Sequence, residues 1–144
     1  LLAFEYDVLL TVAAARAAHA TGLAFHVSFV SWRSAELLSG EPLAAGLAAV
    51  APFAPLSVGV NCLPPSAVPA CLPVLAGCGL PFGVYANLGA PLAQAAAMHS
   101  EECTPEQFAA HARGWLQAGA RLIGGCCGTR PAHIRALADL LAAR

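Results

Sequence analysis

The fold of this chain is decided by two short runs that share one pattern. Residues 57–62 read SVGVNC, and residues 121–128 read RLIGGCCG. Each run is apolar with β-branched residues, and each then ends in small or polar residues. Such runs are typical of strands that are buried in a parallel sheet. We therefore expect Cys62 and the adjacent Cys126 and Cys127 to lie at the carboxyl ends of two strands.

These three cysteines predict a metal site. Two adjacent cysteines do not easily form a disulfide with each other, but both thiolates can reach one ion. A third thiolate, from Cys62 on a neighbouring strand, would complete a set of three ligands. Zinc with three protein ligands and an open fourth position is the arrangement found in catalytic sites. The alternative is that Cys62, Cys126 and Cys127 are ordinary core residues, since free cysteine is often buried.

Outward from these runs, the chain alternates between predicted strands and helices. We expect strands at residues 1–5, 23–30, 56–61, 81–86 and 121–125. We expect helices at residues 11–21, 42–50, 66–76 and 104–118, and a last helix from residue 129 onward. Thr11 is the expected cap of the first helix, and Thr104 with Gln107 forms a capping box. The series predicts one α/β domain over residues 1–144, with a parallel sheet and helices outside it.

A polar or metal-binding residue falls at the end of every predicted strand. These residues are Glu5, Ser28, Asn61 with Cys62, the segment 85–87, and Cys126 with Cys127. In a (β/α)8 barrel the active site is built at this face, from the strand ends and the loops that follow them. The repeated coincidence indicates an enzyme site at the carboxyl edge of the sheet.

Composition narrows the classes of partner. The chain has 144 residues, of which 58% are hydrophobic and 10% charged, and its net charge is −1. This balance argues against nucleic acid or an anionic membrane surface as a partner. No Asp, Glu, Lys or Arg occurs from Pro42 to Ser100. Prolines recur through that stretch and break any long apolar helix, so we expect no membrane span.

The six cysteines bear on the compartment. No basic leader with a cleavage pattern is visible, so we expect no secretory signal and a cytoplasmic location. In that setting clustered cysteines more often indicate metal binding or catalysis than disulfides. A disulfide-linked secreted domain is the less favoured alternative.

Several motifs occur in the order found in a known family. They are FE at residues 4–5, GVNC at 59–62, VYAN at 84–87, and GGCCGT at 124–129, followed by Pro131 and His133. On these residues the chain resembles the homocysteine S-methyltransferase family. The resemblance implies a partial (β/α)8 TIM barrel, to which this chain would supply about strands four to eight with their helices. The Asp-Gly-Gly element of the family's first strand is absent here, so the N-terminal strands would be missing.

The resemblance also implies a reaction. Zn2+ held by Cys62, Cys126 and Cys127 would take the thiol of homocysteine into its open position and remove the proton. A free thiol has a pKa of roughly 8.5, so metal binding would raise its nucleophilic fraction at neutral pH. A methyl group from a small-molecule donor would then pass to the sulfur and give methionine. No cobalamin or folate module is evident, which favours a small sulfonium or ammonium donor.

Three further residues are substrate-binding candidates, mostly on the resemblance. Glu5 would pair with the ammonium group of the amino-acid substrate, or form an ordinary buried salt bridge. Asn87 would offer its carbonyl oxygen to the metal, hydrogen-bond the substrate, or simply cap a turn. Ser28 would face the mouth of the barrel, and Asn61 is expected only to cap its strand.

Other residues with reactive side chains receive no role at this stage. Cysteines without partners at ligand spacing are expected in the core or on the surface; they are Cys71, Cys78 and Cys103. His26 is expected to be packed along its strand, and His133 is expected to be solvated on its helix. His99 lies in the long connection after the fourth strand, and its role stays open.

A second hypothesis concerns the short length of the resemblance. Five strands cannot close an eight-stranded barrel, so two strand edges would stay open. The chain would then be a truncated, catalytically inactive remnant that binds zinc or pairs with another chain. Open edges would also allow a homo-oligomer.

Overall fold

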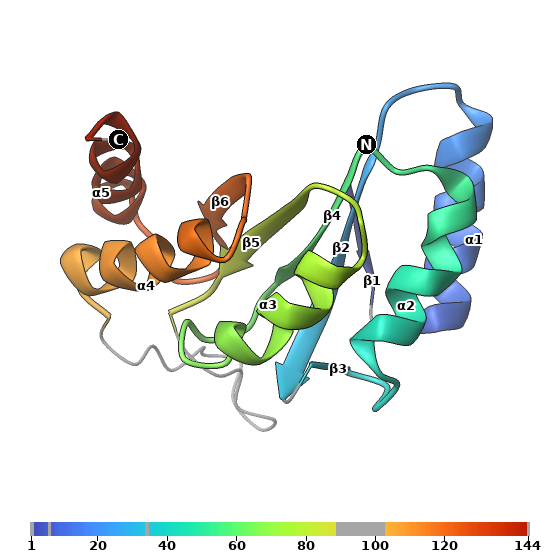
Figure 1. The fold of residues 1–144 in the computed structure, drawn as a ribbon, viewed down its shortest axis with the longest axis horizontal. Helices are drawn as coiled ribbons and strands as arrows, with labels where there is room; N and C mark the ends of the chain where they lie inside the picture. Colours follow the sequence, from blue (N-terminus) through green and yellow to red (C-terminus); the bar gives the residue numbers. More distant parts are fainter. Residues whose placement is uncertain (1, 6, 34, 89–102, 144) are drawn as a thin grey trace.

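The structure, a computed structural model, describes residues 2–5, 7–33, 35–88 and 103–143, without the side chains of residues 2–5, 32 and 33. Strands and helices alternate along the chain (Figure 1). The strands are β1 (Leu2–Glu5), β2 (His26–Arg33), β3 (Glu36–Leu37), β4 (Ser57–Asn61), β5 (Phe82–Ala86) and β6 (Leu122–Gly125). The helices are α1 (Val8–Ala20), α2 (Leu43–Val50), the 3-10 helix η1 (Ala51–Phe53), α3 (Val68–Gly77), α4 (Pro105–Gln117) and α5 (Pro131–Ala142).

The strands form one sheet in which all the long pairings are parallel. The order is β1-β2-β4-β5-β6, and the short β3 pairs antiparallel with the end of β2. Because all five main strands run in the same direction, their carboxyl ends meet at one edge of the sheet. The predicted α/β class with a parallel sheet is therefore confirmed. The strand β3 was not predicted, because two residues are too few to show a pattern.

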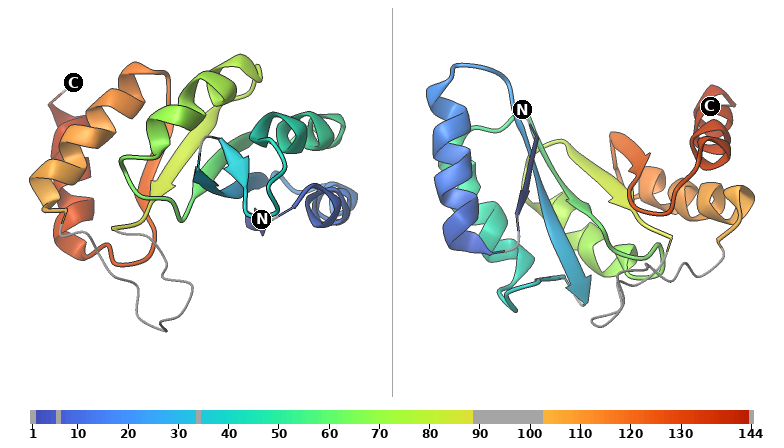
Figure 2. Two further views of the ribbon diagram at one scale, coloured as in Figure 1. Left: turned by 90° about the horizontal axis from the view of Figure 1, so that it is seen from below. Right: turned by 180° about the vertical axis from the view of Figure 1, so that it is seen from behind.

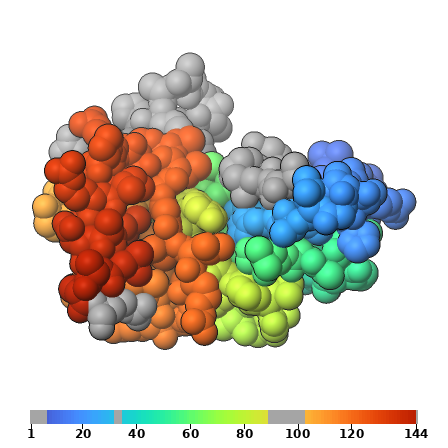
Figure 3. All heavy atoms as spheres, turned by 90° about the horizontal axis from the view of Figure 1, so that it is seen from above, coloured from blue at the N-terminus to red at the C-terminus, as the bar shows by residue number. Residues whose placement is uncertain are grey.

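One face of the sheet packs against the helices and forms the core. The aromatic ring of Phe29 on β2 lies so close to Gly46 on α2 that a Cβ at that glycine would stand 2.7 Å from it. Val58, Val60 and Val84 on the same face are fully buried. The helices lie around the outside of a curved sheet (Figure 2). Figure 3 shows α1 and α5 at opposite ends of the molecule.

Local signals set most helix boundaries, with one correction. The capping box of Thr104 and Gln107 is present at the start of α4, as predicted. Thr11 does not cap α1. The helix begins at Val8, with the Asp7 carboxylate accepting from the Leu10 N–H at 2.8 Å. Thr11 is buried inside the helix, and its hydroxyl donates to the Asp7 carbonyl oxygen. An Asp side chain is a better N-cap than Thr, and here it precedes Thr11 by one turn.

Two further observations concern β2 and the apolar middle of the chain. Strand β2 runs from His26 to Arg33, about three residues later than the predicted 23–30. Within the part of the chain that the structure describes, no helix has the length and apolar character needed to cross a membrane.

Candidate metal centre

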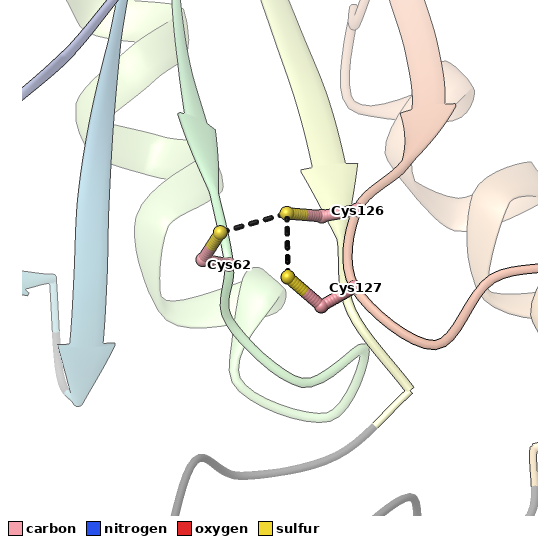
Figure 4. Close-up of side chains that lie close together, drawn as sticks. All are labelled: Cys62, Cys126 and Cys127. Atoms are coloured by element: carbon pink, nitrogen blue, oxygen red, sulfur yellow. Dashed lines mark hydrogen bonds between the residues drawn. The ribbon is translucent and has the colours of Figure 1, made fainter. Parts of the chain in front are cut away.

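Three thiols meet at the carboxyl edge of the sheet. Cys62 follows β4, and Cys126 and Cys127 follow β6. All three Sγ atoms lie within 4.8 Å of one another. The Cys62 and Cys126 sulfurs are 2.7 Å apart, and those of Cys126 and Cys127 are 3.7 Å apart. The three side chains point toward one another (Figure 4). Among the described residues, this is the only group of three or more His, Cys, Asp or Glu side chains that could hold a metal.

The backbone of β5 holds both cysteine-bearing segments in place. The Cys62 N–H donates to the Tyr85 carbonyl at 3.1 Å, and the Cys126 N–H donates to the Ala86 carbonyl at 2.8 Å. Cys62 has φ of 57°, in the left-handed region that residues other than glycine rarely adopt. Such a conformation persists only where the surrounding structure enforces it, and it is common at functional sites. Here it turns the chain at the end of β4, immediately after Asn61.

The pKa values of the three thiols are shifted in different directions. The hydrogen bond from Cys126 lowers the pKa of Cys62 to about 7, against the opposing effect of burial. The same hydrogen bond raises the pKa of Cys126, and burial adds to that rise. Burial also raises the pKa of Cys127. Near neutral pH Cys62 is therefore the thiol that ionises first, and its negative charge is stabilised by the hydrogen bond from Cys126.

The donor set fits zinc. Thiolates are soft ligands that select zinc, and tetrahedral Zn–S bonds of about 2.3 Å place two sulfurs about 3.8 Å apart. The Cys126–Cys127 separation of 3.7 Å already matches this spacing. The Cys62–Cys126 pair would have to open by about 1 Å to accept the ion. Cys127 is exposed and the other two are half-buried, so the cluster has an accessible side.

The three predicted substrate-binding residues have different surroundings from one another. Ser28 on β2 is fully buried, and its hydroxyl donates to Asn61 Oδ1 at 2.7 Å. Asn87 is also fully buried, directly after β5, and its backbone N–H donates to the Leu63 carbonyl at 3.0 Å. Glu5 is the last residue of β1, and its side chain lies outside the described part of the chain.

Asn61 and Tyr85, on the two strands next to the cluster, form contacts that the sequence did not indicate. Asn61 pairs with Ser28 rather than capping its strand. The Tyr85 ring lies over Gly124, where a Cβ would stand 2.8 Å from Tyr85 Cδ1. Burial raises the pKa of Tyr85. Asn61, Tyr85 and Gly124 share one register position across β4, β5 and β6, so they occupy the same face of the sheet.

The remaining cysteines and histidines lie elsewhere. Cys71, Cys78 and Cys103 belong to or pack against the hydrophobic core and take no part in the metal-binding group. His133 is buried, not solvated as predicted. Its Nδ1 accepts from the Arg130 N–H at 3.1 Å, and its Nε2 lies 2.9 Å from the Cys103 carbonyl. His26 is half-buried and bonded to Ser57. His99 lies outside the described residues.

Known proteins are similar to this chain in sequence. The sequence model of the family "Homocysteine S-methyltransferase" matches residues 1–141. The homocysteine S-methyltransferase of Escherichia coli K12 is 38% identical over 115 residues, which cover 76% of this chain and 36% of that protein. The homocysteine S-methyltransferase YbgG of Bacillus subtilis is 35% identical over 83 residues, which cover 57% of this chain and 26% of that protein.

A solved structure is also similar. The crystal structure of the metallated homocysteine methyltransferase MmuM from Escherichia coli superposes with a TM-score of 0.76 and 32% sequence identity. The match covers 93% of this chain and 42% of that one. The chain therefore spans about a quarter to two fifths of the length of these relatives.

Proposed function

Because this chain belongs to the homocysteine S-methyltransferase family, we propose that it forms the metal-binding part of an enzyme that methylates homocysteine. The reaction would move a methyl group from a small-molecule donor to the thiol of homocysteine and give methionine. The observation that carries the proposal is the cluster of Cys62, Cys126 and Cys127 at the carboxyl edge of a parallel sheet. A cytoplasmic location is part of the proposal, and cell fractionation would test it.

The proposed architecture is a partial (β/α)8 barrel. The five parallel strands would correspond to about strands four to eight, with their helices outside. This is supported by the strand order, by the helices that surround the sheet, and by the match to 42% of a solved relative. Further strands would lie between β6 and β1 in a closed barrel.

The three thiolates would hold the zinc ion, and each would contribute differently. Zinc bound by them supplies a Lewis acid that lowers the pKa of a substrate thiol. Cys62, with its pKa near 7, would release its proton to solvent most easily when a metal binds. The exposed Cys127 lies on the side from which substrate would approach.

The other predicted residues would act around this centre. Glu5, at the end of β1, would bind the ammonium group of homocysteine. Asn87, at the end of β5, would hydrogen-bond the substrate or offer its oxygen to the metal. Ser28 is fully buried, so it would act on the site through Asn61 rather than touch the substrate.

A second candidate function follows from the sheet edges. Within the described residues, no strand pairs with the outer edge of β1 or β6, and Leu122 on β6 is 40% exposed. An unpaired strand edge is a template for another chain. The alternative is therefore an inactive remnant that binds zinc or pairs with another chain, either a second copy or another protein.

Zinc stoichiometry is the first test. The purified chain is expected to bind about one zinc per chain, with three sulfur ligands by zinc-edge X-ray absorption. Adding homocysteine should raise the sulfur count from three to four, and supplying S-methylmethionine or betaine should then yield methionine. The Cys78→Ala variant is the matched control, because Cys78 is half-buried and lies outside the cluster.

The outcomes separate the two functions. Zinc binding with a fourth sulfur from homocysteine and methionine production would support the methyltransferase. Zinc binding without turnover, together with self-association in sedimentation experiments, would support the remnant. A chain that binds no zinc would contradict the methyltransferase and would leave a remnant that pairs with another chain.

A further inference from the structure

A buried amide immediately precedes one of the clustered thiols in the chain. Asn61, the residue before Cys62, is 1% exposed, and Ser28 on the neighbouring strand is 0% exposed. The Ser28 hydroxyl donates to Asn61 Oδ1 at 2.7 Å, so the orientation of the amide is fixed by that contact. The Nδ2 atom of Asn61 is buried, and it has no hydrogen-bond partner among the described residues.

We propose that Ser28 and Asn61 are positioning residues that aim the Asn61 amide N–H at the Cys62 sulfur and stabilise it as a charged metal ligand. The inference rests on the proposed function, because it concerns the same metal centre. Ser28 contributes by holding the oxygen of the amide, which leaves the nitrogen as the end available to the neighbouring cysteine.

The chemistry explains why a donor would be kept unpaired here. A neutral thiol is a weak acceptor, whereas a thiolate accepts strongly, as other charged acceptors do. The Asn61 N–H therefore gains a good partner only when Cys62 is ionised, as it must be to bind a metal. The Asn61 side chain also lies in contact with that of Cys62. Groups that bond to a metal ligand from behind commonly change metal affinity by about 10- to 100-fold.

The sheet supplies a matched control for this contact. Ser57, on the same strand as Asn61, is 5% exposed, and its hydroxyl lies 2.7 Å from His26 Nδ1. Ser57→Ala and Ser28→Ala therefore each remove one buried hydroxyl and one hydrogen bond of equal length. Only Ser28 bonds to the residue that precedes a proposed ligand.

The experiment measures the zinc dissociation constant by competition with a chromophoric chelator, without substrate. Asn61→Asp is expected to weaken zinc binding about 10- to 100-fold, since it replaces the N–H by a carboxylate oxygen beside Cys62. Ser28→Ala should weaken it several-fold, and Ser57→Ala should leave it within about twofold of the parent chain. Cobalt-substituted protein should keep the charge-transfer bands of three thiolates in each variant. The double variant should bind no more weakly than Asn61→Asp alone, because Ser28 acts through Asn61.

The contrary results are distinct from failure of the proposed function. A parent chain that binds zinc, with Ser28→Ala and Asn61→Asp equal to it, would overturn the inference and leave the metal centre standing. Equal losses in Ser28→Ala and Ser57→Ala would also overturn it, because the effect would then be general destabilisation. Ser28→Ala removes a single oxygen atom, so it carries the test if Asn61→Asp does not fold. A parent chain that binds no zinc would overturn the proposed function itself, and the inference with it.

Discussion

Cys62 and Cys126 are 64 residues apart in the chain, yet their sulfurs approach to 2.7 Å across an intervening strand. Strand β5 lies between the strands that the two residues follow, and each residue donates its backbone N–H to a carbonyl at the end of β5. The cysteines therefore reach toward each other over the end of β5. Their proximity therefore depends on the register of three strands.

Removing one thiol should abolish stoichiometric zinc binding. Cys126 lies between the other two sulfurs, and two thiolates rarely hold a catalytic zinc. We expect Cys126→Ala to weaken zinc binding by more than about 100-fold. Loss of a ligand should exceed the roughly 10- to 100-fold effect of losing a group that hydrogen-bonds to a ligand. Metal analysis after dialysis would show this, with Cys78→Ala as the control. Stoichiometric zinc in Cys126→Ala would refute the assignment of the ligands.

The left-handed backbone at Cys62 should be visible in stability. With φ at 57°, a residue with a Cβ is disfavoured, and glycine is not. In metal-free protein we expect Cys62→Gly to be more stable to urea than Cys62→Ala by about 1 kcal/mol. At Cys78, where φ is −79°, the same pair of substitutions should show the opposite order. An alanine variant at least as stable as glycine at position 62 would contradict the account.

His133 should stabilise the start of α5 through both ring nitrogens. The Nδ1 atom accepts from the Arg130 N–H, so Nε2 carries the proton and donates to the Cys103 carbonyl. The ring also packs edge-on against the ring of Phe108, with 5.8 Å between the two ring centroids. His133→Phe keeps an aromatic ring but loses both hydrogen bonds, and we expect it to cost about 1–3 kcal/mol in urea unfolding. His111→Phe, at an exposed position on α4, should cost much less. Equal effects of the two substitutions would show that the hydrogen bonds of His133 contribute nothing.

Mild acid should destabilise the fold through His26. Burial lowers the pKa of His26 from its usual value near 6.5. As pH falls below about 6.5, the unfolded chain takes up a proton that the folded chain resists, so the stability contributed by neutral His26 is lost. In the presence of a metal chelator, unfolding free energy should fall less between pH 7.5 and 5.5 in His26→Gln than in the parent.

The control for this pH effect is another histidine. His111 lies at an exposed position on α4, so His111→Gln makes the same substitution away from the core. If His26→Gln and the parent lose stability in parallel on acidification, the effect belongs to other groups.

The sequence by itself determined the features that depend on neighbouring residues. The apolar runs before Cys62 and Cys126 predicted two strands, and the capping box of Thr104 and Gln107 predicted the start of α4. These signals are local: strand and helix periodicity and capping each act over a few residues. The alternation of strands and helices then required a parallel sheet, which brings the strand ends to one edge.

Only the tertiary structure decided which side chains touch. The Ser28–Asn61 bond, the left-handed turn at Cys62 and the burial of His133 each depend on residues distant in sequence or on the packing around them. A shift of one residue in strand register would move Asn61 to the opposite face from Ser28. That register is set by the burial of Val27, Val58 and Val84 against the helices, a collective packing effect that no short stretch of sequence encodes.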